Sequence, residues 1–187
     1  MRISVLASFF LLFTAVSAGA EPTTMPLHDA KRPVPAIVFA DETGNRLTLE
    51  DWRDKVILLN IWATWCPPCR HEMPTLDRLQ GKLGGENFEV LALSIDRAGP
   101  KVVRAFFDKI EVKHLRLLID ETGASARNLG AYGLPVTLLI DPDGAELSRI
   151  IGPAEWDTPE MIAFFEKIIS AMSDHLKTDN PSSDDKG

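Results

Sequence analysis

The residues best suited to chemistry in this chain are its two cysteines, Cys66 and Cys69, which are separated by Pro67 and Pro68. Two thiols at this spacing can form a short disulfide, supply two ligands to a metal ion, or exchange disulfides with another protein. Each of these roles needs different surroundings, so the neighbouring sequence helps to choose among them.

A structural disulfide and a metal site both fit this pair poorly. A bridge stabilises mainly by closing a loop in the unfolded chain, and a four-residue loop contributes only about 1.9 kcal/mol, against about 4.7 kcal/mol for a 100-residue loop. A structural zinc site would need a second pair of ligands, and the sequence has no further cysteine pair and no H-x₃₋₅-H motif. Covalent haem attachment needs a histidine directly after the second cysteine, where the chain has Arg70, followed by His71.

The flanking residues favour thiol–disulfide exchange instead. The apolar run 56–62 predicts a strand buried on both faces, and a helix is predicted from Pro67 to about Leu83. Cys66 then lies at a helix N-terminus, where unpaired N–H groups and the helix dipole favour the attacking thiolate. Cys69 follows one turn later and can close the ring and expel the partner. The two prolines are tolerated because first-turn N–H groups have no partner within the helix.

Strands and helices alternate along the rest of the chain. Residues 37–39 and 47–49 flank a turn rich in glycine and asparagine, which predicts a hairpin. Further strands are predicted at 89–95, 115–119, 136–140 and 146–151, and further helices at 101–110, at 124–129 and from Pro159 onward, with Thr158 as its N-cap. This order predicts an α/β fold with a central mixed β-sheet flanked by helices and an N-terminal β-hairpin extension.

The two ends of the chain differ from the middle. Residues 1–20 combine Arg2, an uncharged apolar stretch and small residues before position 21, which predicts a signal peptide, with an N-terminal membrane anchor as the alternative. Residues 21–35 contain four prolines and are expected to form an extended linker. The domain is expected at 36–175, followed by a disordered acidic tail at 176–187. Export would place the two thiols where disulfides form.

The composition describes one acidic globular domain. The chain has 187 residues, 45% hydrophobic and 25% charged side chains, and a net charge of −7. No lysine or arginine cluster accompanies this acidic balance, which argues against nucleic acid as a partner, since phosphate backbones are bound by basic groups. His28, His114 and His175 share no metal-ligand spacing and are expected at the solvated surface.

Two distant motifs resemble those of a known family. The run from Asn60 to Glu72, which contains the Trp65-Cys66-Pro67-Pro68-Cys69 segment, and the later segment from Tyr132 to Asp141 resemble the thioredoxin superfamily, specifically its exported TlpA/ResA/CcmG-like thiol-disulfide oxidoreductases. The resemblance covers about residues 35–172 and implies a thioredoxin fold. The segments 79–83 and 152–156 are most similar to the TlpA branch.

The resemblance implies roles for individual residues. Cys66 matches the nucleophile and Cys69 the resolving thiol of the redox-active disulfide. Pro135 matches a cis-proline beside the disulfide, and the backbone of Leu134 would pair with an incoming partner chain. An ordinary trans-proline at a strand start is the alternative for Pro135.

Further residues around the motif match the family less uniformly. Asn60 stands where cytosolic thioredoxins have a buried acid. Glu72 matches an acid of ResA-like proteins and could take the proton from Cys69, with a solvated helix glutamate as the alternative. Trp65 and Pro67 are expected to contact the substrate beside the disulfide, with core packing as the alternative for Trp65.

The resemblance also implies a function and partners. We expect a periplasmic protein-disulfide reductase that needs no cofactor and no metal, is kept reduced by an inner-membrane electron donor of the DsbD/CcdA type, and is a monomer. Its disulfide-containing protein substrates would be assembly factors for the copper site of cytochrome oxidase or, as in the CcmG/ResA type, apocytochrome c. The alternative from another class is a Cu(I)-binding, metallochaperone-like module, since thiolates suit that ion, but the motif lacks a third ligand.

Overall fold

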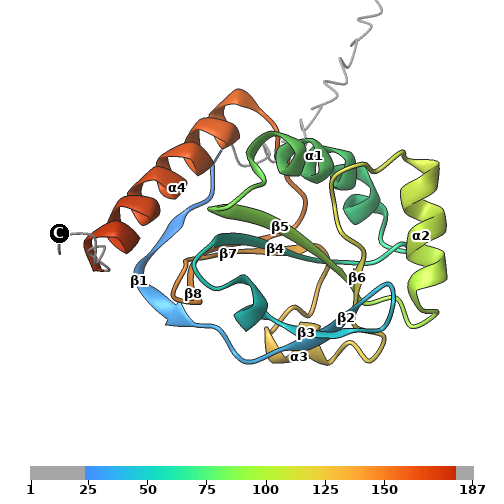
Figure 1. Ribbon diagram of the computed structural model, residues 1–187. Coiled ribbons are helices and arrows are strands. Elements are labelled where there is room, and N and C mark those ends of the chain that lie inside the picture. The colour runs from blue at the N-terminus through green and yellow to red at the C-terminus, as the bar shows by residue number, and fades with distance from the viewer. Residues whose placement is uncertain (1–23, 180–187) are drawn as a thin grey trace, which may run out of the picture.

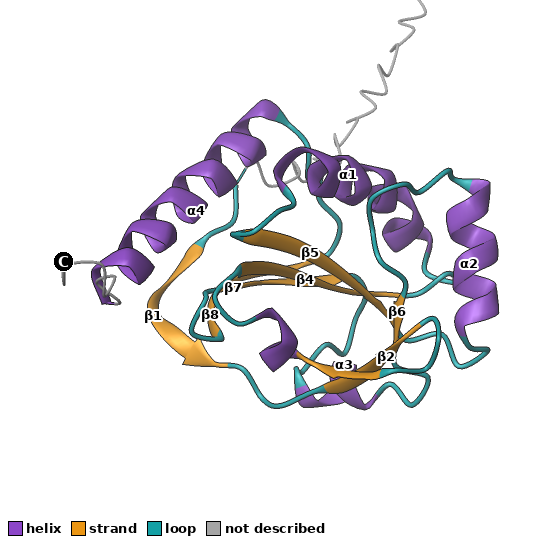
Figure 2. Ribbon diagram, viewed as in Figure 1, coloured by secondary structure: helices purple, strands orange, loops and turns teal. Residues whose placement is uncertain are grey.

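The computed structural model describes residues 24–179, which form one mixed β-sheet with helices on both faces (Figures 1 and 2). The strands of this region are β1 (Leu27–Pro33), β2 (Val38–Asp41), β3 (Arg46–Thr48), β4 (Val56–Trp62), β5 (Phe88–Ser94), β6 (Leu118–Ile119), β7 (Val136–Ile140) and β8 (Ala145–Ile151). The helices are the 3₁₀ helix η1 (Leu49–Trp52) and the α-helices α1 (Pro67–Leu83), α2 (Pro100–Lys109), α3 (Ala124–Asn128) and α4 (Pro159–Asp179). The predicted α/β class, mixed sheet and N-terminal hairpin are therefore confirmed.

The sheet order places β4 in the interior. The strands run β1-β8-β7-β4-β5-β6-β2-β3, with β4, β5 and β6 parallel to one another and the other pairs antiparallel. Strand β4 pairs with β5 on one side and β7 on the other, so it is hydrogen-bonded along both edges. All its residues are buried, as the apolar run predicted.

Alternation along β4 divides the core into two layers. Val56, Leu58 and Trp62 face the cluster that includes the apolar sides of α1, α2 and α4. Ile57, Leu59 and Ile61 face the second cluster, which includes α3 and the hairpin. Figure 1 shows the same division, with α3 on the side of the sheet opposite to α1 and α4. Asn60 interrupts the first set and lies on the α1 face, because side chains alternate along a strand.

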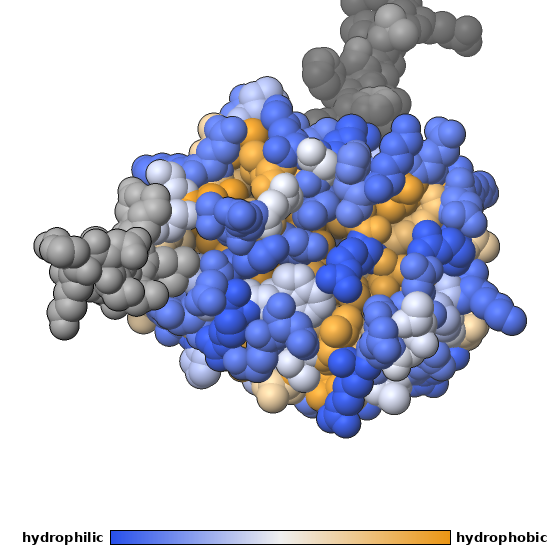
Figure 3. Space-filling model, in the orientation of Figure 1, coloured by the Kyte–Doolittle hydropathy of each residue, from blue (hydrophilic) through white to orange (hydrophobic). Residues whose placement is uncertain are grey.

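The apolar surface is largely covered. In the face drawn in Figure 3, hydrophobic residues show only as separate strips between hydrophilic ones. Within residues 24–179, no helix combines the length and the apolar character that crossing a membrane requires. The predicted signal peptide or anchor at 1–20 lies outside the described residues.

The expectation of a linker at 21–35 is wrong for most of that segment. Strand β1 lies at the edge of the sheet and pairs antiparallel with β8, and Met25 is buried in the core. The pairing uses backbone groups, and nearly all of its side chains are exposed, so no apolar alternation marks the strand in the sequence. Prolines are compatible with this position because an edge strand needs hydrogen bonds on one side only.

Two other boundaries also differ from the prediction. The strand expected at 115–119 is reduced to Leu118–Ile119, because the Asp77 carboxylate accepts the backbone N–H groups of Lys113, His114 and Leu115 and holds this stretch as a loop. Residues 176–179, which were expected to belong to the tail, are part of α4, since this helix continues to Asp179. The rest of the tail lies outside the described residues.

Candidate active site

The two cysteines form a disulfide where β4 passes into α1. Cys66 is the N-cap residue of α1, and its Sγ accepts a hydrogen bond of 3.3 Å from the backbone N–H of Cys69. Pro67 and Pro68 occupy the first two helical positions, as predicted, and both are exposed. Cys66 is 4% exposed and Cys69 is fully buried, so only the first sulfur is within reach of a partner.

The chain before Cys66 is held by the end of β5. Asp96 is buried and accepts the backbone N–H of Thr64 at 2.8 Å and its hydroxyl at 2.7 Å. The Ser94 hydroxyl also donates to Asp96, at 2.8 Å. Trp65, the next residue, is 64% exposed. Core packing, the alternative for Trp65, is therefore wrong, and its indole lies on the surface next to the nucleophile.

Pro135 adjoins this junction through the sheet register. The Leu134–Pro135 peptide bond is cis, as the resemblance implied. Val136 pairs with Ile61, so Pro135 lies beside the end of β4 that leads to Cys66. The Pro135 carbonyl accepts the N–H of Gly152 at 2.9 Å, which ties this turn to the end of β8. Leu134 remains half-buried, and its role in pairing with a partner stays a prediction.

Glu72 is buried beneath the disulfide-bearing turn of α1. It is 1% exposed, which rules out the alternative of a solvated helix glutamate. Its Oε1 accepts from Asn60 Nδ2 at 2.8 Å, and its Oε2 accepts from Trp156 Nε1 at 3.0 Å and the backbone N–H of Ala154 at 3.1 Å. Three donors are the environment that a buried carboxylate requires. Its role as proton acceptor for Cys69 stays a prediction.

Asn60 links this carboxylate to the strand that follows the cis-proline. Its Nδ2 also donates to the Thr137 hydroxyl at 2.8 Å. Its Oδ1 is buried without a hydrogen-bond partner among the described residues. Asn60 therefore acts as a hydrogen-bond donor to Glu72, at the position where cytosolic thioredoxins have an acid. The acidic residue of this buried network lies on α1 and not on β4.

Trp156 and Thr137 also belong to this network, although neither is a site residue that the sequence predicts. In the sequence, the 152–156 segment stands out only by its resemblance to one branch of the family, and Thr137 belongs to a run of apolar strand residues. In the structure this segment brings two donors to Glu72, and the Trp156 backbone N–H donates to Thr75 Oγ1 at 3.1 Å. No local sequence pattern predicts these hydrogen bonds, because 82 or more residues separate Glu72 from the donors in Ala154 and Trp156.

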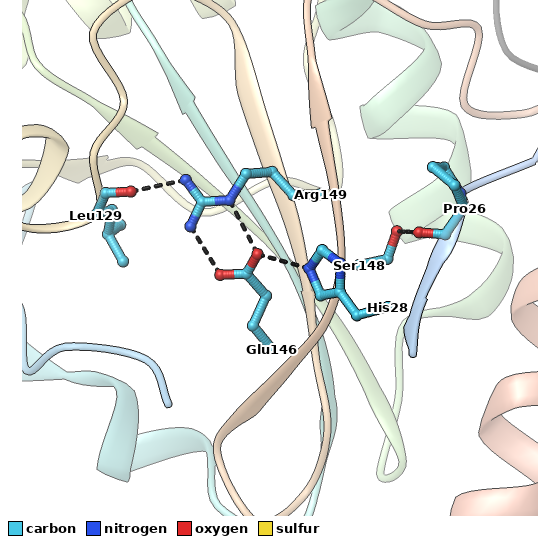
Figure 4. Close-up of polar contacts among 6 residues, drawn as sticks. All are labelled: Pro26, His28, Leu129, Glu146, Ser148 and Arg149. Atoms are coloured by element: carbon cyan, nitrogen blue, oxygen red, sulfur yellow. Dashed lines mark hydrogen bonds and ion pairs between the residues drawn. The ribbon is translucent and has the colours of Figure 1, made fainter. Parts of the chain in front are cut away.

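A second buried polar cluster anchors the chain that leads to Pro135 (Figure 4). Arg149 makes two hydrogen bonds to the Glu146 carboxylate, at 2.9 and 2.7 Å, and its Nη1 donates to the Leu129 carbonyl at 2.7 Å. His28 on β1 lies 3.0 Å from the same carboxylate. The His28 side chain is only 14% exposed, so the expectation of a solvated histidine is wrong. Next to it, Ser148 Oγ donates to the Pro26 carbonyl at 2.6 Å.

This cluster predicts an acid-sensitive contribution to stability. Burial alone would raise the pKa of Glu146, but the hydrogen bonds from Arg149 and His28 outweigh it and lower the pKa below its usual value of 4.5. A lowered pKa in the folded state stabilises the protein above the unfolded-state value, and this contribution is lost as pH falls through the folded-state pKa. We expect Glu146→Gln to cost about 1–3 kcal/mol in the free energy of unfolding at pH 7 and less at pH 3, measured by urea denaturation.

His28 also contacts the Glu146 carboxylate, so the comparison is repeated in a His28→Gln background. In that background, the loss in free energy of unfolding caused by Glu146→Gln should still be smaller at pH 3 than at pH 7. A difference of equal size at both pH values would contradict the role given to the Glu146 charge.

The described residues hold no group of three or more histidine, cysteine or acidic side chains arranged to bind a metal ion. What the structure brings together at one end of the sheet is the disulfide, the cis-proline turn, the exposed Trp65 and the buried Glu72. An accessible sulfur at a helix N-terminus with a second sulfur one turn away can attack a disulfide and then release the product.

The chain is similar to known proteins both in sequence and in structure. The Redoxin family model matches residues 29–163. A thiol-disulfide oxidoreductase ResA from Bacillus thuringiensis subsp. konkukian (strain 97-27) is 34% identical over 118 residues, which cover 63% of this chain and 67% of the relative. A thiol:disulfide interchange protein DsbE from Pseudomonas fluorescens biotype C is 32% identical over 158 residues, or 81% of this chain and 84% of the relative.

The structural comparison agrees on the fold. The crystal structure of a thiol:disulfide interchange protein of the thioredoxin family from Chlorobium tepidum TLS matches with a TM-score of 0.59 at 21% identity, covering 78% of this chain and 98% of that one. The predicted thioredoxin fold and the likeness to ResA/CcmG-like proteins are therefore confirmed. The finer similarity to the TlpA branch stays a prediction.

Proposed function

Since this chain belongs to the Redoxin family of the thioredoxin superfamily, and is a thiol-disulfide oxidoreductase like its ResA and DsbE relatives, we propose that it reduces disulfides in protein partners outside the cytoplasm. The observation that carries the proposal is the Cys66–Cys69 disulfide at the N-terminus of α1, in which Cys66 is 4% exposed and Cys69 is fully buried. This asymmetry separates an attacking thiol from a resolving thiol.

The first step is attack by the reduced protein. The Cys66 thiolate attacks one sulfur of the partner disulfide, so that a Cys66–partner bond forms while the partner's own S–S bond breaks. The released partner sulfur leaves as a thiolate and takes up a proton. The helix N-terminus favours the attacking Cys66 thiolate through its dipole and through the backbone N–H of Cys69, which donates to Cys66 Sγ at 3.3 Å.

The second step resolves the mixed disulfide. Cys69 loses its proton and attacks Cys66 Sγ, which forms the intrachain disulfide and releases the second partner sulfur. The partner gains two electrons and two protons, and this protein is oxidised by the same amount. Glu72 lies one helical turn beyond Cys69 in the interior, and we assign its carboxylate as the acceptor of the Cys69 proton.

The proposed compartment and partners are supported by the resemblance and by the sequence of residues 1–20. A signal peptide or N-terminal anchor there would deliver the domain to the periplasm, where an inner-membrane dithiol donor of the DsbD/CcdA type would reduce it after each turnover. The TlpA-like segments favour assembly factors of the cytochrome oxidase copper site as substrates, with apocytochrome c as the second candidate. We infer that the protein works as a monomer.

The direction of electron flow is tested by the reduction potential of the Cys66–Cys69 pair, measured against glutathione. We expect a value near that of thioredoxin, about −270 mV, which suits a reductant. A value near that of DsbA, about −120 mV, would instead make the protein an oxidant and overturn the proposal.

A further inference from the structure

A groove opens on the surface beside the nucleophile. It has a volume of about 570 Å³ and runs from Trp65, next to Cys66, along the loop after β5 to α3 and the turn before Pro135. The strand pairing predicted for Leu134 would bring a partner chain past its edge. The groove is therefore placed to take residues that flank the partner's disulfide, while Cys66 takes the sulfur.

Two exposed aromatic side chains line this groove. Trp65 is 64% exposed and Tyr132 is 90% exposed, which makes them two of the most exposed large apolar side chains in the described part of the chain. Exposed aromatic residues gathered beside a reactive group are typical of a surface that a partner covers. Their presence indicates a protein segment as occupant.

The charges in the groove indicate what kind of segment it is. Arg97 and Arg127 both line the groove and are exposed, although the chain as a whole carries a net charge of −7. Arg127 Nη1 donates to the Thr122 carbonyl at 3.0 Å. This acceptor is neutral, so the hydrogen bond does not neutralise the positive charge of the guanidinium. Asp96 also lines the groove, but it is buried and accepts from Thr64 and Ser94.

We propose that the groove selects partner proteins with acidic residues next to the disulfide that is to be reduced. This inference rests on the proposed function and adds a substrate class to it. Arg97 and Arg127 would contact the carboxylates of the partner. Trp65 and Tyr132 would pack against the apolar parts of the side chains in the same partner segment. Complementary charge acts mainly on the rate of association and on the choice of partner.

The test uses two synthetic peptides, each closed by the same internal disulfide and differing only in a short flanking run of glutamates or of lysines. The second-order rate constant for reduction by the dithiol form of the full chain is measured for both. Each value is divided by the rate constant with dithiothreitol, a small dithiol that has no binding groove, which corrects for the intrinsic reactivity of each peptide disulfide. We expect the acidic peptide to react about 5-fold faster or more at low ionic strength, with the ratio falling toward one in high salt.

Two pairs of variants change the net charge equally. Arg97→Glu combined with Arg127→Glu should abolish or invert the ratio. Arg32→Glu combined with Arg46→Glu, at exposed positions on β1 and β3 outside the groove, should keep it. Arg97→Lys combined with Arg127→Lys keeps the charge and should keep the preference. The salt dependence of the wild-type protein tests, without any substitution, whether the preference is electrostatic.

The outcomes separate this inference from the proposed function. Reduction of both peptides with a ratio near one, or an equal fall in both glutamate variants, would overturn the selection by Arg97 and Arg127 and leave the reductase proposal standing. Reduction of neither peptide would contradict the reductase proposal itself, and the inference with it.

Discussion

Replacing the buried cysteine, Cys69→Ser, is expected to trap a mixed disulfide between Cys66 and the protein partner. Cys66 can still attack, because it keeps 4% exposure whereas Cys69 has none, but no second thiol remains to release the product. We expect turnover to fall on the order of 10⁴-fold, the scale seen when one member of a catalytic unit is removed. The complex is detected by non-reducing electrophoresis, and mass spectrometry of the trapped partner identifies the substrate.

The matched control is Cys66→Ser, which should lose turnover to a similar extent without trapping a partner. The remaining Cys69 sulfur is fully buried and cannot reach a disulfide on another protein. Equal trapping by both variants would show that the roles given to the two cysteines are wrong.

Replacing the buried carboxylate, Glu72→Leu, is expected to destabilise the protein by about 3 kcal/mol or more in the free energy of unfolding. The substitution leaves three buried donors, those of Asn60, Ala154 and Trp156, without their acceptor. Each unsatisfied buried group costs about 1–3 kcal/mol. Urea denaturation of the two proteins at neutral pH measures the difference.

Glu72→Gln provides the matched control for shape. Its oxygen can still accept from Ala154 and Trp156, and Asn60 can turn its amide so that Oδ1, now unpartnered among the described residues, accepts from the new amide group. We therefore expect a loss of only about 1 kcal/mol. A loss as large as that of the leucine variant would contradict this hydrogen-bond arrangement.

The glutamine variant also tests the chemistry assigned to Glu72. An amide cannot accept the Cys69 proton as a carboxylate does, so resolution of the mixed disulfide should slow while its formation continues at the normal rate. Single-turnover kinetics with a pre-reduced protein separates the two steps. Unchanged resolution in a folded Glu72→Gln variant would remove Glu72 from the mechanism and leave it a structural role only.

The groove beside Trp65 and the buried network around Glu72 serve different parts of the same reaction. The groove acts before chemistry, by favouring partners of one charge. In the proposed mechanism, the network acts in the second exchange step, at the buried sulfur of Cys69. The residues that line the groove and those that are hydrogen-bonded to Glu72 are different among the described residues. Charge reversal at Arg97 and Arg127 should therefore change the choice of partner, whereas substitution of Glu72 should change the resolution step.

Local sequence was enough to predict the redox motif, its place at a strand–helix junction and most of the strands and helices. These features depend on neighbours in the chain: apolar residues in a run form β4, and Pro67 and Pro68 fit only the first turn of a helix. The cis-proline at Pro135 required the resemblance to a family as well, since an X-Pro sequence alone favours the trans form.

The tertiary structure alone decided which polar residues are buried and which segments pair. Glu72 fits a solvated helix face by its type and becomes an interior acceptor only because β4 and the segment after β8 bring donors to it. Strand β1 has no apolar pattern, because backbone pairing with β8 holds it. The groove is likewise assembled only by the fold, because its aromatic and basic side chains come from three loops and from α3. Hydrogen bonds and contacts between residues far apart in the chain leave no periodic trace in a single sequence, and the fold brings these residues together.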